Sequence, residues 1–352
     1  MSSRTGEDGS VTQPPRAEQP LLQVEGLRTH FSTEHGVVKA VDGVDFTIER
    51  GGILGMVGES GSGKSVTGLS ILRLLDPRNS TIAGGRVLFD GEDLLTKSDK
   101  EMRAIRGRRI SMVFQNAMTA LDPFFRVGDQ LVEIIQLHQR LGRREARAKA
   151  LEALELVRIP EAGRRLSSYP HQLSGGQRQR VMIALALACG PDLLIADEPT
   201  TALDATVQKQ IIELLLDVNR ELGTAILMVT HDFGVVARMC RTVAVMYAGR
   251  IAEAGDVRTV LERPEHPYTL GLMRAVPRVR SGVRRKSDRL YQIAGAPPAR
   301  SAHADGCAFA PRCPEAVPHC SADEPPRIGF GNGHSVLCHE RVASKEVGRV
   351  SA

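Results

Sequence analysis

The stretch GESGSGKS (residues 58–65) follows the apolar run ILGMV and leads into SVTGLSILRLL, which has the pattern of a helix. It matches G-x-x-x-x-G-K-S/T in the strand-to-helix context that this phosphate-binding motif requires. Its glycines let the backbone curl so that N–H groups point at phosphate oxygens, and the helix adds its positive N-terminal dipole. The sequence therefore predicts a nucleoside triphosphate site made by Gly58, Glu59, Ser60, Gly61, Ser62, Gly63, Lys64 and Ser65. Lys64 is expected to reach the β- and γ-phosphates, and Ser65 to ligate Mg²⁺.

The composition is that of a soluble globular protein. The chain has 352 residues, 42% hydrophobic and 25% charged, with a formal net charge of +5. No run approaches the roughly 18 apolar residues needed to span a bilayer. The first twenty residues are polar and rich in proline, with no apolar signal region, so residues 1–20 are expected to be disordered. A chain without a secretory signal is expected in the cytosol, where thiols stay reduced.

Strand-like and helix-like patterns alternate along most of the chain. Strands alternating with helices predict an α/β fold with a mostly parallel sheet and ligand chemistry at the carboxyl ends of its strands. Between about residues 127 and 168 only helical patterns occur, which predicts a helical insertion. Near residue 265 the chain becomes rich in Pro, Gly, Arg and Cys, so a boundary is expected there, followed by a small, loop-rich tail.

Three further side chains are candidates for hydrolytic chemistry. The strand-like run LLIADEP places Asp197 and Glu198 at a strand end, where Asp197 can hold Mg²⁺ and Glu198 can act as general base on the attacking water. His231 follows the strand TAILMV and is a candidate for contacting the γ-phosphate and orienting that water. Gln115 follows the strand-like run ISMVF, and its uncharged polar side chain can ligate Mg²⁺ or position water.

The stretch LSGGQRQR (residues 173–180) predicts a second anion site. Ser174 can cap a helix whose first turn contains two glycines, which leaves several N–H groups free. Because a phosphate loop already serves the nucleotide of this chain, this stretch is expected to bind a nucleotide held by another subunit. The predicted residues are Ser174, Gly175, Gly176 and Gln177.

This ordered set of motifs, with ALD at residues 202–204, resembles the ATP-binding cassette (ABC) ATPases over about residues 21–262. The tail, with HPYTLGLMRAVP, QIAGAPP and GCAFAPRCPEAVPHC, is similar to the C-terminal extension of oligopeptide/dipeptide importer ATPases, a group that includes nickel and glutathione importers. The resemblance implies a P-loop NTPase fold with a RecA-like core, an antiparallel β subdomain and a helical subdomain at about residues 116–185. It divides the chain into an ATPase domain, residues 21–265, and a cysteine-containing extension, residues 266–352.

The resemblance also implies a function. The chain would be a peripheral, ATP-hydrolysing subunit on the cytoplasmic face of the membrane that powers uptake of di- or oligopeptides. Its partners would be two permeases, a second ATPase that is often a paralogous chain, and an extracytoplasmic substrate-binding protein, with no nucleic acid. Asp204 would lie in the contact between the ATPases, and Phe31 is the candidate for stacking on adenine. Alternatives are an importer ATPase for nickel chelates or glutathione, and an ABC ATPase with no role in transport.

Six cysteines are present, four of them in the tail. Cys189 and Cys240 are expected to be packed small hydrophobic residues. The spacings C-x5-C, C-x6-C and C-x17-C match neither the usual zinc motifs nor the compact ferredoxin motif. By resemblance, a 4Fe–4S cluster with a structural role is favoured, and zinc and unligated thiols stay open as alternatives. The four tail residues are Cys307, Cys313, Cys320 and Cys338.

Overall fold

The computed structural model describes residues 19–115, 120–201, 203–275, 291–296 and 306–341. The expected disordered segment, residues 1–20, lies outside this range except for its last two residues. The centre is an eight-stranded sheet in the order β11-β12-β10-β9-β3-β8-β7-β6. Strand β3 pairs in parallel with β8 and β9, and β7 pairs in parallel with β8 and β6. Its core strands are β3 (Ile53–Val57), β6 (Ile110–Val113), β7 (Leu193–Asp197), β8 (Ala225–Thr230), β9 (Thr242–Tyr247) and β10 (Arg250–Asp256).

The central strands are apolar along their whole length because both faces of the sheet are covered. Every residue of β3, β7 and β8 is buried. Near-continuous apolar runs are typical of parallel strands packed between helices. Three helices pack against the parallel part of the sheet: α1 (Lys64–Ile71), α8 (Ala205–Leu222) and α9 (Phe233–Met239). The expected α/β class is confirmed, and the predicted phosphate loop leaves the carboxyl end of β3.

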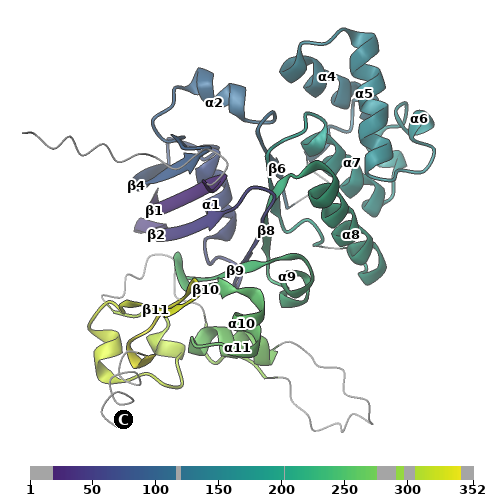
Figure 1. The fold of residues 1–352 in the computed structure, drawn as a ribbon. Helices are drawn as coiled ribbons and strands as arrows, with labels where there is room; N and C mark the ends of the chain where they lie inside the picture. The colour runs from purple at the N-terminus through teal and green to yellow at the C-terminus, as the bar shows by residue number, and fades with distance from the viewer. Residues whose placement is uncertain (1–18, 116–119, 202, 276–290, 297–305, 342–352) are drawn as a thin grey trace, which may run out of the picture.

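Two further subdomains flank this core (Figure 1). One is a four-stranded antiparallel sheet, order β2-β1-β4-β5, from which α2 (Asp99–Ile105) continues the chain. The other is a group of helices on the opposite side. Both subdomains were expected. The strands are β1 (Leu22–Thr33), β2 (Gly36–Ile48), β4 (Ser80–Phe89) and β5 (Glu92–Asp93); the helices are α4 (Val127–Gln139), α5 (Arg143–Leu156), α6 (Ala162–Arg165) and α7 (Gly175–Leu187).

The first helix is shorter than its sequence pattern predicts. The apolar spacing of SVTGLSILRLL continues to Leu75, whereas α1 ends at Ile71. The chain leaves the helix at Arg73, which has a φ of 50°, in the left-handed region. Its guanidinium donates to backbone carbonyls beyond β4, including that of Leu94 at 3.4 Å. This tertiary contact outweighs the local helical preference.

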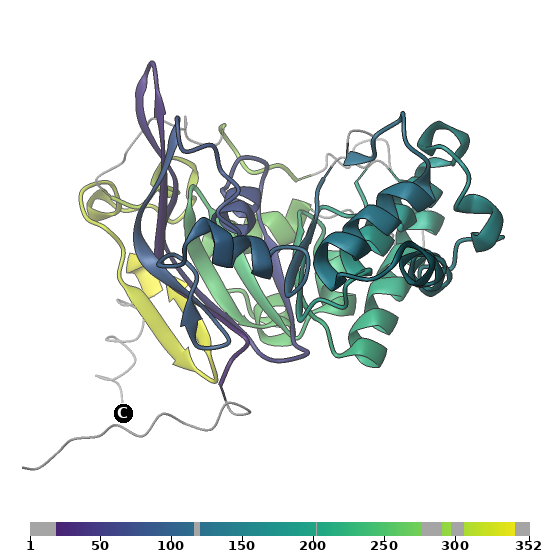
Figure 2. The ribbon, with the colours of Figure 1, turned by 90° about the horizontal axis from the view of Figure 1, so that it is seen from above.

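The C-terminal extension adds two strands to the edge of the core sheet, and the described residues that precede these strands, from residue 291 on, are loops and short 3-10 turns. After α10 (Val257–Glu262) and α11 (Pro267–Ala275), the chain adds the hairpin of β11 (Arg327–Gly331) and β12 (His334–Leu337). Strand β12 pairs antiparallel with β10, with Glu253 opposite Val336 and Ala254 opposite Ser335. The hairpin, yellow in Figure 2, therefore lies at the edge of the same sheet that carries the phosphate loop.

Candidate nucleotide site

The phosphate loop has the backbone geometry that its glycines make possible. Gly63 has a φ of 108°, and a Cβ there would lie 2.3 Å from the carbonyl oxygen of Ala40. A Cβ on Gly58 would lie 2.1 Å from the carbonyl oxygen of Met246. Both positions therefore require glycine, because neither backbone neighbour can move as a flexible side chain can. The loop is fixed from outside by β2 and the end of β9.

The ammonium of Lys64 is buried inside the loop. It donates to the carbonyl oxygens of Gly58 at 2.8 Å and Glu59 at 2.9 Å. Burial lowers the pKa of Lys64, and the nearby carboxylates of Glu198, Asp197 and Glu59 oppose that shift. Because the loop carbonyls are weak, neutral partners, the charged oxygens of a phosphate can compete for this ammonium.

Ser65 and Asp197 meet at the position where a magnesium ion is expected. The hydroxyl of Ser65 donates to Oδ1 of Asp197 at 2.9 Å, although the residues are 132 positions apart. Burial raises the pKa of Asp197, and the adjacent charge of Glu198 adds to this, whereas the Ser65 hydrogen bond and Lys64 lower it. A hydroxyl and a carboxylate are hard oxygen ligands of the kind Mg²⁺ takes in nucleotide sites. These two side chains fit that ion.

Glu198 is surrounded by three polar side chains. Its carboxylate accepts from Nε2 of Gln115 at 2.9 Å and from the hydroxyl of Thr201 at 2.8 Å, and Nδ1 of His231 lies 3.3 Å away. Its backbone has a φ of 47°, which is rare for a residue with a side chain. Such strain is concentrated at functional sites, where the surrounding structure holds it. The three predicted residues Gln115, Glu198 and His231 are therefore brought together.

The carboxylate of Glu198 is suited to accept a proton at neutral pH. Burial raises its pKa, but the hydrogen bonds from Thr201 and His231 and the charges of His231 and Lys64 outweigh burial, so the pKa lies below its ordinary value. The group is therefore ionised at pH 7 and able to polarise water. Thr201 was missed by the sequence interpretation, although its place three residues after Glu198 is a local signal.

The predicted second anion site is exposed and lies at the start of α7. Ser174 accepts from the Gln177 N–H at 3.3 Å, and the Gln177 side chain accepts from the Ser174 N–H at 3.1 Å, which completes a capping box. The hydroxyl proton of Ser174 stays available for an external acceptor. A Cβ on Gly176 would lie 2.7 Å from Val207 on α8, whereas Gly175 has open space around it.

The two residues predicted from family resemblance lie in different surroundings. Asp204 caps α8, where its carboxylate accepts from the N–H groups of Thr206 at 3.0 Å and Val207 at 2.9 Å. Ala202, in the same predicted contact, lies outside the described residues. Phe31 is half-buried on β1, opposite Val38 of β2 and Ser80 of β4. Its contact with adenine stays a prediction.

The four tail cysteines line one small cavity together with residues such as Phe309 and Ala310. Burial raises the pKa of Cys307 and Cys338, and raises that of Cys313 to about 11. Such thiols are protonated at pH 7, so a metal that binds here must displace their protons. None of the six described cysteines forms a disulfide.

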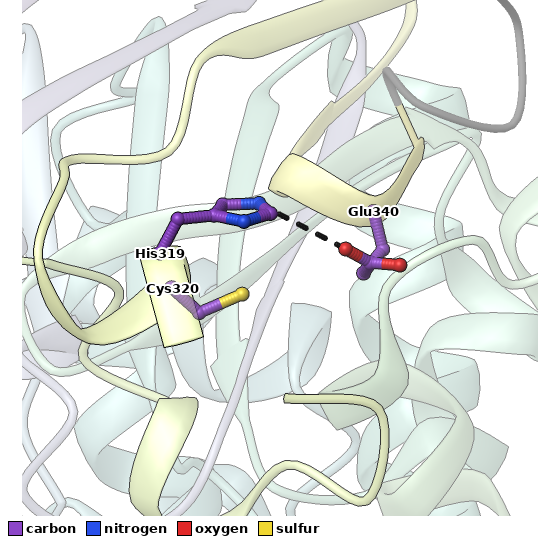
Figure 3. Close-up of side chains that lie close together, drawn as sticks. All are labelled: His319, Cys320 and Glu340. Carbon is purple, nitrogen blue, oxygen red and sulfur yellow. Dashed lines mark ion pairs between the residues drawn. The ribbon is translucent and has the colours of Figure 1, made fainter. Parts of the chain in front are cut away.

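One of these cysteines, Cys320, also belongs to a second group of potential metal ligands. Among the described residues, His319, Cys320 and Glu340 bring three ligand atoms within 4.8 Å of one another (Figure 3). Nε2 of His319 lies 3.9 Å from Oε1 of Glu340. The four thiols are not grouped that closely, whereas a tetrahedral zinc with Zn–S bonds of about 2.3 Å would hold its sulfurs only about 3.8 Å apart.

Comparisons with known proteins agree with this geometry. A family model described as ABC transporter matches residues 41–201, and one described as the oligopeptide/dipeptide transporter C-terminal region matches residues 252–320. The chain is 51% identical to the "Probable peptide ABC transporter ATP-binding protein y4tR" of Sinorhizobium fredii, covering 92% of this chain and 96% of that protein. It is 47% identical to the "Oligopeptide transport ATP-binding protein OppD" of Salmonella typhimurium, covering 95% and 97% respectively.

A solved structure gives the same result for the core. The dimeric ATP-binding cassette MJ0796, in a post-hydrolysis state bound to ADP and phosphate, is 31% identical with a TM-score of 0.60. The match covers 67% of this chain and 99% of that cassette. The fold and the loop between β3 and α1 thus define an ATP-hydrolysing cassette. The chain belongs to the ABC transporter ATP-binding proteins of the oligopeptide/dipeptide family. Within its described part, no helix is both long and apolar enough to cross a bilayer.

Proposed function

We propose that this chain powers the uptake of di- or oligopeptides from the cytoplasmic face of the membrane. The observation that carries the proposal is the family match at residues 252–320, together with relatives named for peptide and oligopeptide transport. Importer ATPases for nickel chelates or glutathione are the alternatives within the same group. The residues 21–265 would form the ATPase domain and residues 266–352 the extension.

The described geometry supports a role for each side chain of the site. Lys64 would bind the phosphates, Ser65 and Asp197 would hold Mg²⁺, and Glu198 would polarise the attacking water. Gln115 and His231 contact Glu198 and would orient that water, and Gln115 is also a candidate Mg²⁺ ligand. Mg²⁺ would neutralise charge that develops on the β- and γ-phosphates.

The exposed start of α7 supports a dimer of ATPase subunits. Ser174 is exposed and retains a free hydroxyl proton, so the motif of residues 174–177 can contact a nucleotide bound to a second ATPase subunit. Asp204, at the start of α8, would lie in the same contact. ATP would then close the pair, and hydrolysis would reopen it and drive two permeases supplied by an extracytoplasmic binding protein.

The substrate proposal is tested with the assembled importer in lipid vesicles. Purification from membranes should recover two permease subunits with this chain. Adding the binding protein loaded with a di- or oligopeptide should stimulate ATP hydrolysis several-fold, and a nickel chelate or glutathione should not. Stimulation by nickel chelate or glutathione alone would replace the peptide assignment, and recovery of this chain without permeases would contradict the importer role.

The cysteine cavity is proposed to hold a 4Fe–4S cluster, which separates its thiolates further than zinc does because each ligates a different iron. Anaerobically purified protein is expected to be brown and to contain about four iron atoms per chain. Replacing Cys313 by Ser should remove most of the iron, and replacing Cys189 by Ser should not. Stoichiometric zinc would support the alternative metal, and a folded, metal-free extension would support unligated thiols.

A further inference from the structure

The C-terminal extension reaches the phosphate loop through a buried arginine. Arg312 donates from Nη1 to Oε2 of Glu59 at 2.7 Å and from Nη2 to Oε1 at 3.0 Å. The two residues are 253 positions apart, and the side chain of Arg312 is only 5% exposed. Two parallel hydrogen bonds from one guanidinium fix the carboxylate in both position and orientation.

Glu59 is the second residue of the phosphate loop, and all of its polar groups are held. Its N–H donates to the hydroxyl oxygen of Tyr268 at 2.8 Å, and its carbonyl accepts from Lys64 at 2.9 Å. Its carboxylate is bound by Arg312. Glu59 is therefore contacted from both sides. The extension holds its N–H and its carboxylate, and Lys64, which is expected to bind phosphate, holds its carbonyl oxygen.

Arg312 lies in the short segment between Cys307 and Cys313. Phe309, in that segment, packs against Tyr247 and Tyr268 with ring centroids 5.2 and 5.4 Å away. Arg312 also donates from Nε to the carbonyl of Ala294 at 3.0 Å and from Nη1 to the Tyr247 hydroxyl at 3.3 Å. The guanidinium is therefore held both by Ala294 of the extension and by Tyr247 at the end of core strand β9, in addition to Glu59.

The ion pair between Arg312 and Glu59 affects the charge of the phosphate loop. A glutamate in a phosphate-binding loop repels a triphosphate unless a cation neutralises it, and the repulsion is strong where water is excluded. We infer that Arg312 is a positioning residue of the nucleotide site, which neutralises Glu59 and fixes its carboxylate beside the phosphate loop. The extension is then part of the ATP site. This inference rests on ATP binding and is independent of the transported substrate.

The test measures the affinity of the purified full-length chain for a fluorescent ATP analogue. Arg312→Ala is expected to raise Kd at least about tenfold, because one uncompensated charge within about 12 Å of a phosphate charge has an effect of that size at an effective dielectric constant near 20. The steady-state KM should rise equally, and kcat should change less than twofold. Arg312→Lys keeps the charge but loses the paired geometry, so an intermediate Kd is expected.

A double variant separates the loss of charge compensation from a loss of folding. In Arg312→Ala combined with Glu59→Gln, the uncompensated charge is gone, so Kd should return to within about threefold of the wild type. Arg341→Ala is the matched control, because Arg341 lies in the same extension and bonds to the carbonyl of Glu265 instead of Glu59. Its Kd should not change. If Arg312→Ala fails to fold, the uncharged Arg312→Gln, alone and combined with Glu59→Gln, gives the same comparison. A wild-type Kd in Arg312→Ala, or no recovery in the double variant, would overturn the inference.

Discussion

Replacing Glu198 by Gln is expected to lower kcat for ATP hydrolysis by about 10²- to 10⁴-fold, the usual contribution of a general base. The amide keeps the shape of the side chain and can still contact Thr201 and Gln115, but it cannot accept a proton. ATP binding should persist, because the phosphates are held by Lys64 and the loop. Phosphate release measures the loss, and size-exclusion chromatography with ATP should show a stable dimer.

The pH dependence gives a second readout for Glu198. Because its pKa lies below the ordinary value, the carboxylate stays ionised as pH falls through the range where an ordinary glutamate begins to protonate. Removing the supporting hydrogen bond with Thr201→Val should raise that pKa, so the acidic limb of the kcat profile should move to higher pH. Glu262 is an exposed carboxylate on α10, so Glu262→Gln is the matched control. It should leave both kcat and the acidic limb of the kcat profile unchanged. Wild-type hydrolysis in Glu198→Gln would refute its role as base.

The side chains that the sequence places at one site belong to the phosphate loop or follow a strand-like run. The loop of residues 58–65 is recognised from its own glycines and from the strand and helix next to it, although β2 and β9 also hold it in place. Asp197 and Glu198 follow a short apolar run that is typical of a buried strand, and parallel strands place their carboxyl ends at one edge of the sheet. Once the order of the strands is known, these positions are enough to predict that Ser65 meets Asp197 and that Gln115 and His231 meet Glu198.

The contacts that sequence does not predict connect segments far apart in the chain. The tail hairpin has glycine and polar residues between its few apolar ones, so it has no strand pattern strong enough to stand out, and its pairing with β10 is decided by tertiary contacts. The ion pair between Arg312 and Glu59 has no local signal either. Only the general rule that a buried charge needs a partner would have prompted a search for it.

Glu253 is a buried connection between the core and the extension. It lies on β10 with no exposed surface, and its carboxylate accepts from three donors. These are the N–H groups of Glu265 at 2.9 Å and His266 at 3.0 Å, and Nε2 of His334 at 2.9 Å. One carboxylate thus holds both the entry to α11 and strand β12.

Replacing Glu253 by Ala is therefore expected to lower the free energy that docks the extension by about 3–5 kcal/mol, as loss of one partner in a buried charged network does. Glu253→Gln keeps part of the network and should cost about 1–3 kcal/mol. Amide hydrogen exchange at Val336 and His266 measures undocking directly. Glu324→Ala, an exposed ion-pair partner of Arg250, is the control and should cost less than about 1 kcal/mol.

Glu253→Ala also tests whether docking of the extension affects the nucleotide site. If Arg312 positions Glu59 only while the extension is docked, Glu253→Ala should weaken ATP binding in proportion to the undocked fraction, although Glu253 makes no contact with the phosphate loop among its described hydrogen bonds. Adding ATP should in turn protect Val336 from exchange, because the coupling between two sites is reciprocal. An undocked extension with an unchanged Kd for ATP would show that the extension is held by Glu253 but does not act on the nucleotide site.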